Sequence, residues 1–159
     1  MHFDHLGLAG WLVEKWGANG VHMQLITVIT GTFPISLSFQ QGAKLPLFKT
    51  AIGIAQLATR TDEEIVKAVK RANRRVVSTH NIVNLDELME DIKATRSKGY
   101  FEAYNRVIPD TGAIAMALPG VSSESSLVVS VGGLSDRIKK NEDKILREMR
   151  QAIQRYRGD

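Results

Sequence analysis

The chain has 159 residues, of which 43% are hydrophobic and 24% charged, and it contains no cysteine. This length and composition are those of one globular domain with a buried core. The lack of cysteine excludes disulfides, thiolate zinc sites and cysteine nucleophiles, and it agrees with a cytoplasmic protein. No apolar run reaches the roughly 20 residues of a membrane span, and the N-terminus lacks the basic segment of a secretory signal.

The formal net charge of +4 is spread along the chain. Residues 136–159 combine eight basic with five acidic side chains. A second basic cluster ends an expected helix, where positive charge complements the helix dipole. That cluster consists of Lys67, Lys70, Arg71, Arg74 and Arg75. A nucleic-acid surface would combine a one-sided basic patch with a recognisable motif, so the sequence favours solvated helix faces over a phosphate-binding surface.

In chain order, the first predicted element is an amphipathic helix over residues 4–17, where apolar side chains recur at helical spacing. Two strands follow, at 21–30 and 35–39, and the second alternates strictly between apolar residues and serine. The residues between these strands are typical of a hairpin turn.

The middle of the chain predicts three helices. The first spans 45–59 with Pro46 at its start, and it contains Gly53, which destabilises a helix unless a neighbour packs closely there. The second opens with a capping-box pattern of Thr61 and Glu64. The third opens with the same pattern at Asn84 and Glu87, and it ends at Gly99.

The last part of the chain predicts three strands and a final helix that begins near Asn141. The strands are expected at about 100–107, 113–118 and 126–132. Strands that occur in groups separated by helices are typical of an α+β domain with a mainly antiparallel sheet.

Motifs that carry catalytic chemistry do not occur in the sequence. It contains no glycine-rich phosphate loop and no G-x-S-x-G elbow. His2 and His5 are spaced to reach one metal ion, although a frayed terminus explains them as well, and His22 and His80 fit a packed strand and a loop. Paired carboxylates stand near helix starts, where they complement the dipole. We therefore expect no enzyme, no metal and no cofactor.

Three stretches taken together resemble the C-terminal effector-binding domain of IclR-family transcriptional regulators (the isocitrate lyase regulator type). They are GAKLPLFKTAIGIAQLA (42–58), RSKGYFEAYNRVIPDTGAIAMALP (96–119) and SSLVVSVGGLSDRI (125–138). Their order and spacing agree with the family from about residue 6 to residue 157. The resemblance implies that residues 1–159 form one GAF-like domain, a six-stranded antiparallel sheet flanked by helices.

The resemblance also implies a role and partners. Family members bind small organic acids against one face of the sheet and transmit binding to an N-terminal winged helix-turn-helix. That DNA-binding part is missing from this chain, so we expect either an excised domain or a stand-alone sensor, with DNA contacted only through the missing part. We further expect a homo-oligomer, a dimer or a tetramer, and no membrane partner.

The implied pocket lies between strand 126–132 and the start of the helix near Thr50. Ser130 would offer its hydroxyl to a ligand carboxylate, or would instead bond a carbonyl of a neighbouring strand. Free backbone N–H groups at the helix start favour an anion, and Lys49 adds charge. The expected ligand-binding residues are Lys49, Thr50, Ala51, Ile52, Ala103, Tyr104, Ala113, Ser130 and Gly132.

Departures from the family pattern suggest the ligand class. Phe48 replaces a common histidine, and the segment Ala103-Tyr104-Asn105-Arg106 lacks an aspartate that contacts effector in some members. Tyr104 or Arg106 would supply new contacts on turning inward. Fewer buried polar groups favour a larger, more apolar ligand, so we expect a monocarboxylate with an aromatic or aliphatic body. The alternative is a degenerate pocket in a domain that serves only oligomerisation.

Overall fold

The computed structural model describes residues 9–16, 22–29, 39–119 and 127–157. Its strands are β1 (Ala9–Trp16), β2 (His22–Ile29), β3 (Lys44–Pro46), β4 (Phe101–Tyr104), β5 (Thr111–Ala117) and β6 (Leu127–Leu134). Its helices are α1 (Ala51–Leu57), α2 (Asp62–Arg74), α3 (Leu85–Lys98), α4 (Ser135–Lys140) and α5 (Glu142–Arg157), with a 3-10 helix, η2 (Thr79–Asn81).

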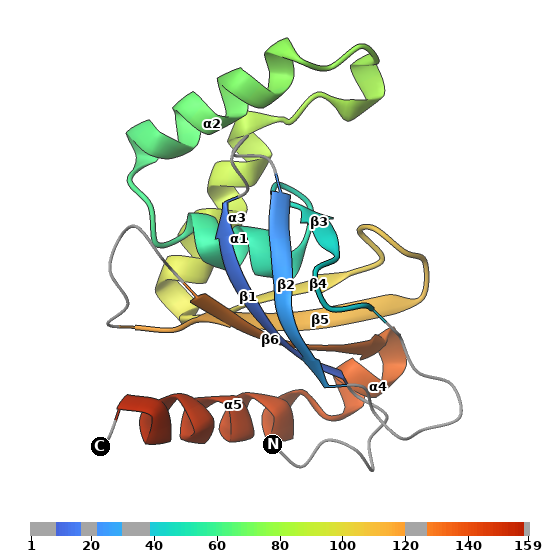
Figure 1. Ribbon diagram of the computed structural model, residues 1–159, viewed down its shortest axis with the longest axis vertical. Helices are drawn as coiled ribbons and strands as arrows, with labels where there is room; N and C mark the ends of the chain where they lie inside the picture. Colours follow the sequence, from blue (N-terminus) through green and yellow to red (C-terminus); the bar gives the residue numbers. More distant parts are fainter. Residues whose placement is uncertain (1–8, 17–21, 30–38, 120–126, 158–159) are drawn as a thin grey trace.

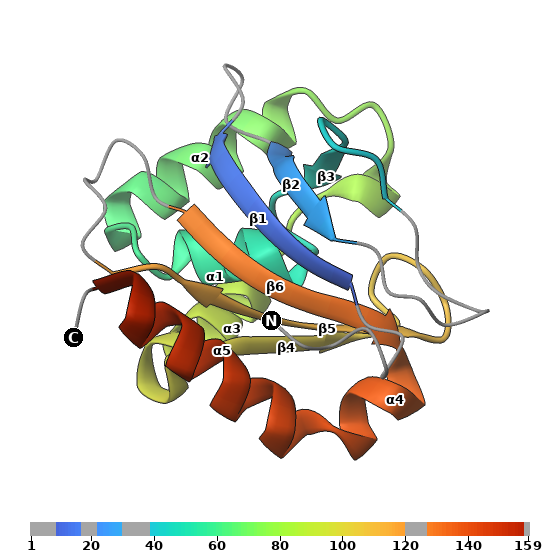
Figure 2. The ribbon, with the colours of Figure 1, turned by 60° about the horizontal axis from the view of Figure 1, so that its bottom comes forward.

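The six strands form one sheet in the order β3-β2-β1-β6-β5-β4, and each neighbouring pair is antiparallel. Helices α1 and α3 cover one face, with α2 outside them, and α4 and α5 lie against the other (Figures 1 and 2). We call these the α1 face and the α5 face. The predicted α+β class with a mainly antiparallel sheet is confirmed.

The N-terminal segment corrects a prediction, because residues 9–16 form strand β1 and not a helix. β1 pairs with β2 on one side and with β6 on the other. Short apolar runs do not distinguish helix from strand by spacing alone. Two ladders of hydrogen bonds decide the matter here, and one of them is made with β6, more than a hundred residues away in the sequence.

The region after β2 also differs from prediction. The predicted strand at 35–39 falls almost wholly outside the described residues, and Phe39 is not in a strand. Instead Pro46 ends the edge strand β3, and α1 begins only at Ala51. Proline lacks an N–H donor, so it is tolerated at a sheet edge. Thr50 caps α1 by accepting a hydrogen bond from the Gly53 N–H, at 3.1 Å.

The later helix starts follow the predicted capping residues. Thr61 and Glu64 form the reciprocal capping box of α2, and the Thr61 N–H donates to the Glu64 carboxylate at 2.9 Å. That bond is the main reason why the pKa of Glu64 is lowered. Asn84 accepts from the first turn of α3, and Gly99 ends that helix in the left-handed region at φ 85°. The final helix predicted from about Asn141 is α5, which begins at Glu142, and a separate short helix, α4, precedes it.

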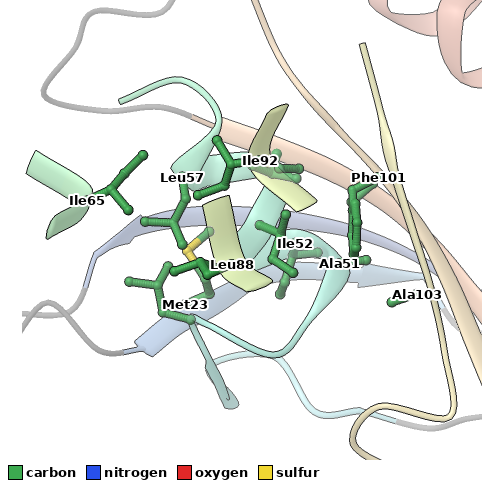
Figure 3. Close-up of a cluster of buried hydrophobic side chains, with 14 of the residues drawn as sticks. Met23, Ala51, Ile52, Leu57, Ile65, Leu88, Ile92, Phe101 and Ala103 are labelled. Atoms are coloured by element: carbon green, nitrogen blue, oxygen red, sulfur yellow. The ribbon is translucent and has the colours of Figure 1, made fainter. Parts of the chain in front are cut away.

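Two apolar clusters hold the layers together, one on each face of the sheet. The cluster on the α1 face joins α1, α2 and α3 to the sheet through side chains such as Ile52, Ile65 and Ile92 (Figure 3). The cluster on the α5 face includes Ile114 and Met149. Strand β5 supplies alanines to the first cluster and Ile114 and Met116 to the second, so the small side chains of this strand face α1.

Candidate functional site

A cavity of about 90 Å³ opens between the start of α1 and the hairpin of β4 and β5. Its walls are mostly apolar, and two cationic side chains, Lys49 and Arg106, contribute to its lining. The lining residues are Phe39, Leu45, Lys49, Thr50, Ala51, Ile52, Ala103, Arg106, Val107, Ile108, Thr111, Gly112 and Ala113. An apolar recess with a few polar groups is the usual form of a small-molecule site.

The structure brings six of the nine expected residues to this cavity. They are Lys49, Thr50, Ala51, Ile52, Ala103 and Ala113. The Thr50 hydroxyl is engaged in the helix cap, since it also donates to the Pro46 carbonyl at 2.7 Å. Helix α1 has only seven residues, and the Gly53 N–H of its first turn already donates to the Thr50 hydroxyl. We therefore assign no anion site to its N-terminus. Lys49 has an exposed side chain at the cavity rim.

Gly53 explains how α1 comes so close to the sheet edge. A Cβ atom built on Gly53 would lie 1.8 Å from the backbone oxygen of Leu47. Only glycine therefore allows the helix to pack on this segment. The close neighbour that the sequence required for Gly53 is the backbone of Leu47, which is itself fully buried.

Ser130 corrects an expectation about the pocket. Its side chain is fully buried, and its hydroxyl donates to the Ile114 carbonyl of β5 at 2.9 Å. Ser130 and Gly132 are not among the described residues that line the cavity. Of the two roles considered for the Ser130 hydroxyl, the structure has the bond to a neighbouring strand. Gly132 is buried opposite Ala113 in the β5–β6 ladder.

Tyr104 also lies away from the cavity, because it packs with the cluster on the α5 face. Its ring lies against Gly112, where a Cβ would approach it to 2.6 Å. Burial, followed by the nearby carboxylates of Glu102 and Glu142, raises the pKa of Tyr104 to about 12. The buried hydroxyl has no hydrogen-bond partner among the described residues. Tyr104 therefore belongs to the packing beneath α5.

Arg106 turns toward the cavity, as the sequence allowed for either Tyr104 or Arg106. Asn105 lies in the left-handed region at φ 57°, which breaks the alternation of strand β4 just before Arg106. The Arg106 guanidinium pairs with the Asp91 carboxylate on α3 at 2.8 Å, and its carbon lies 5.0 Å from the centre of the Phe101 ring. Sequence spacing gave no sign of this pair, because Asp91 and Arg106 belong to different elements.

Among the described residues, the histidines do not add to the lining of the cavity. His22 and His80 are exposed, and His2 and His5 lie outside the described residues. Asp62 pairs with Arg96 at 2.8 Å. Within the described part of the chain, no three histidine or carboxylate side chains come together as metal ligands would. Nor is any described helix long and apolar enough to cross a membrane.

The sequence matches the model of the family described as bacterial transcriptional regulator IclR, C-terminal, over residues 17–156. The chain therefore belongs to this family of regulator domains, which are not enzymes. The predicted family is confirmed, and an enzymatic role is excluded. No curated protein sequence matches the chain.

Solved structures share the fold at low sequence identity. The effector domain of a regulator named IclR from Acinetobacter sp. ADP1 has a TM-score of 0.84 and 24% identity, over 99% of this chain and 90% of that one. An IclR family regulator from Brucella abortus gives 0.77 and 21%, over 96% and 56%. IclR of Thermotoga maritima gives 0.75 and 20%, over 99% and 64%. The chain spans less than two thirds of the last two proteins.

Proposed function

We propose that this chain is the GAF-like, effector-sensing domain of a cytoplasmic IclR-type regulator, and that the cavity beside α1 holds its effector. The effector is a small organic monocarboxylate with an aromatic or aliphatic body. The domain works as a homo-oligomer, and DNA is contacted by a part of the regulator outside this chain. One observation carries the proposal: six residues expected at an effector site, one of them Lys49, line a single mostly apolar cavity.

The chemistry of the cavity supports this ligand class. Ala103 and Ala113 leave space between the β4–β5 hairpin and α1, and Ile52, Val107 and Ile108 give apolar contacts. An apolar ligand body gains about 25 cal/mol per Å² of surface that it buries. Lys49 at the rim meets a carboxylate that remains partly in water. The carboxylate thereby avoids most of the desolvation that burial would impose on it.

The alternative, a domain used only for oligomerisation, also has support. Ser130 is committed to an internal hydrogen bond. Val107 and Ile108, at the cavity mouth, expose 50% and 39% of their surface. Exposed apolar residues of this kind are common where two proteins meet.

A thermal-shift panel tests the proposal with acetate, glyoxylate, hexanoate and benzoate. A ligand at 100 times its Kd adds about 2.7 kcal/mol to stability, which raises the Tm by several degrees. We expect shifts with hexanoate or benzoate that shrink in Lys49→Gln. Lys44→Gln, an exposed lysine of β3 that is absent from the cavity lining, is the matched control.

Two results would contradict the proposal in different ways. No shift with any acid would favour the oligomerisation-only role. Low-micromolar binding of glyoxylate without any response to the larger acids would contradict the ligand class and retain the sensor.

A further inference from the structure

We infer that Arg106 is the residue that recognises the ligand carboxylate, and that the ligand replaces Asp91 as its partner and so releases α3. This inference rests on the proposed function and assigns a specificity residue and a route of signalling to the same site. It starts from the position of one guanidinium at a boundary between two cavities.

A second cavity, of about 300 Å³, adjoins the first between α3 and the segment Phe48–Lys49. Lys49 and Arg106 line both of these cavities, whereas Asp91 lines the second and not the first. The two cations therefore stand at the boundary, and the carboxylate that pairs with Arg106 lies on the side away from the candidate ligand. An anion in the first cavity would approach Lys49 and Arg106 from the side opposite to Asp91.

The present partner of Arg106 is exchangeable. The side chains of Arg106 and Asp91 are 37% and 26% exposed. An ion pair that remains in contact with water contributes a modest stabilisation, small enough for a ligand to replace it and large enough for its loss to affect the local opening of α3. A ligand carboxylate offers the guanidinium the same kind of charged acceptor, and it can accept from two of the guanidinium N–H groups. Meanwhile the ligand body buries apolar surface that the Asp91 pair does not. The exchange is therefore favoured by the part of the ligand that is not charged.

The Phe101 ring helps to keep the guanidinium at the boundary during the exchange. Phe101 is 8% exposed and belongs to the cluster on the α1 face, so the ring is fixed by its packing. A cation 5.0 Å from the ring centre is attracted by the ring face. This contact does not depend on Asp91, so Arg106 remains in place when its carboxylate partner changes.

The exchange reaches α3 because Asp91 lies between Leu88 and Ile92, two of the three buried residues of this helix. Further along α3, Arg96 donates to the carbonyls of Ala58 and Arg60. The helix is thus attached to the hairpin by the Arg106–Asp91 pair and to the α1–α2 connection by Arg96. Loss of the first attachment changes how tightly the first half of α3 is held.

Calorimetric titration with benzoate, or with hexanoate where benzoate gives no shift, tests the exchange, with the matching amide as the uncharged probe. We expect Arg106→Gln to weaken acid binding at least tenfold and to leave amide binding unchanged. We expect Asp91→Asn to tighten acid binding several-fold, because it removes the competitor. Glu90→Gln, a neighbouring exposed carboxylate of α3, is the control and leaves the affinity unchanged.

The outcomes separate the two proposals. If the parent protein binds the acid and Arg106→Gln binds it equally well, the role of Arg106 is refuted while the sensor stands. If Asp91→Asn weakens binding as Arg106→Gln does, Asp91 positions Arg106 and does not compete with the ligand, so the exchange is refuted. If the parent binds none of the acids, the proposed function fails and the inference fails with it.

Hydrogen exchange of the α3 amides supplies a readout for the release. In the parent protein we expect faster exchange over residues 85–95 once the acid is bound, and in Asp91→Asn the same rise without any ligand. Unchanged exchange in both would refute the coupling to α3. Far-UV circular dichroism of each variant establishes that it is folded at the temperature of the titration.

Discussion

Alternate residues of strand β5 face opposite sides of the sheet, and among the described residues they meet different surroundings: a cavity on the α1 face and close packing against α5 on the other. On the α5 face, Ile114 and Met116 of β5 pack against Ile145 and Met149 of α5, and all four are buried. On the α1 face the same strand presents Ala113, which lines the cavity. Alternation of small and large side chains along one strand therefore decides which face has room for a ligand.

The largest effect is expected from a substitution that prevents the close approach of α1 to the backbone of Leu47. In Gly53→Ala the new Cβ would lie 1.8 Å from a backbone oxygen, which no side-chain movement relieves. We expect a loss of more than about 4 kcal/mol and little folded protein, measured by circular dichroism and denaturant unfolding. Gly42→Ala, where nothing lies within 4 Å but φ is +86°, is the control and loses about 1 kcal/mol. Equal losses would contradict the packing explanation.

A second experiment compares the faces directly by changing side-chain volume. Ile145→Ala on the α5 face empties a filled site and is expected to lose about 2–5 kcal/mol. Ala113→Val adds atoms toward the cavity, so we expect a change below about 1 kcal/mol and loss of the acid-induced thermal shift. Ala115→Val, on the same strand and face but fully buried, is the matched control and loses about 1–3 kcal/mol.

Equal losses of stability in the two alanine variants would contradict the presence of usable space on the α1 face. If Ala113→Val and Ala115→Val lose the same stability, then the space beside Ala113 does not accept a side chain and is unsuited to a ligand.

The smallest effect concerns a titratable group on the α5 face. Burial, and then the carboxylate of Glu102, raises the pKa of Glu142. The folded state therefore holds this proton more tightly, and stability falls as the pH rises above the ordinary value of 4.5. We expect Glu142→Gln to raise the Tm by roughly 1–3 °C at pH 7 and to have no effect at pH 3.5.

Asp143→Asn is the control for this experiment, because Asp143 is exposed in the same first turn of α5. Its removal takes away a favourable charge at a helix start, so the Tm stays unchanged or falls slightly. A rise in Tm that matches that of Glu142→Gln would refute the assignment to burial and to Glu102.

Local signals in the sequence were sufficient for some elements and not for others. The caps at Thr61, Asn84 and Gly99 predicted the start of α2 and both ends of α3, because each cap bonds to atoms within a few residues of it. Strand β1 was mistaken for a helix, because its identity depends on pairing with β2 and β6. Apolar spacing at one end of the chain carries no information about partners at the other end.

The same distinction between local signals and distant partners applies to the candidate site. The segment from Lys49 to Ile52 lines the cavity, and its position follows from the start of α1. Ser130 was expected at the pocket, but its hydroxyl finds a carbonyl across the β5–β6 ladder. The direction of Arg106 depends on the left-handed turn at Asn105, which the sequence does not specify.

The pairing of the first described strand with the last one has a consequence for how the chain folds. Strands β1, β2 and β3 are neighbours in sequence, and so are β4, β5 and β6, but Trp11 lies opposite Ser130 across more than a hundred residues. Each group of three closes only short loops, whereas the β1–β6 ladder closes a very long one at greater entropic cost. We therefore expect this seam to form late. During synthesis, the exposed edge of β1 must wait for almost the whole chain before its partner emerges.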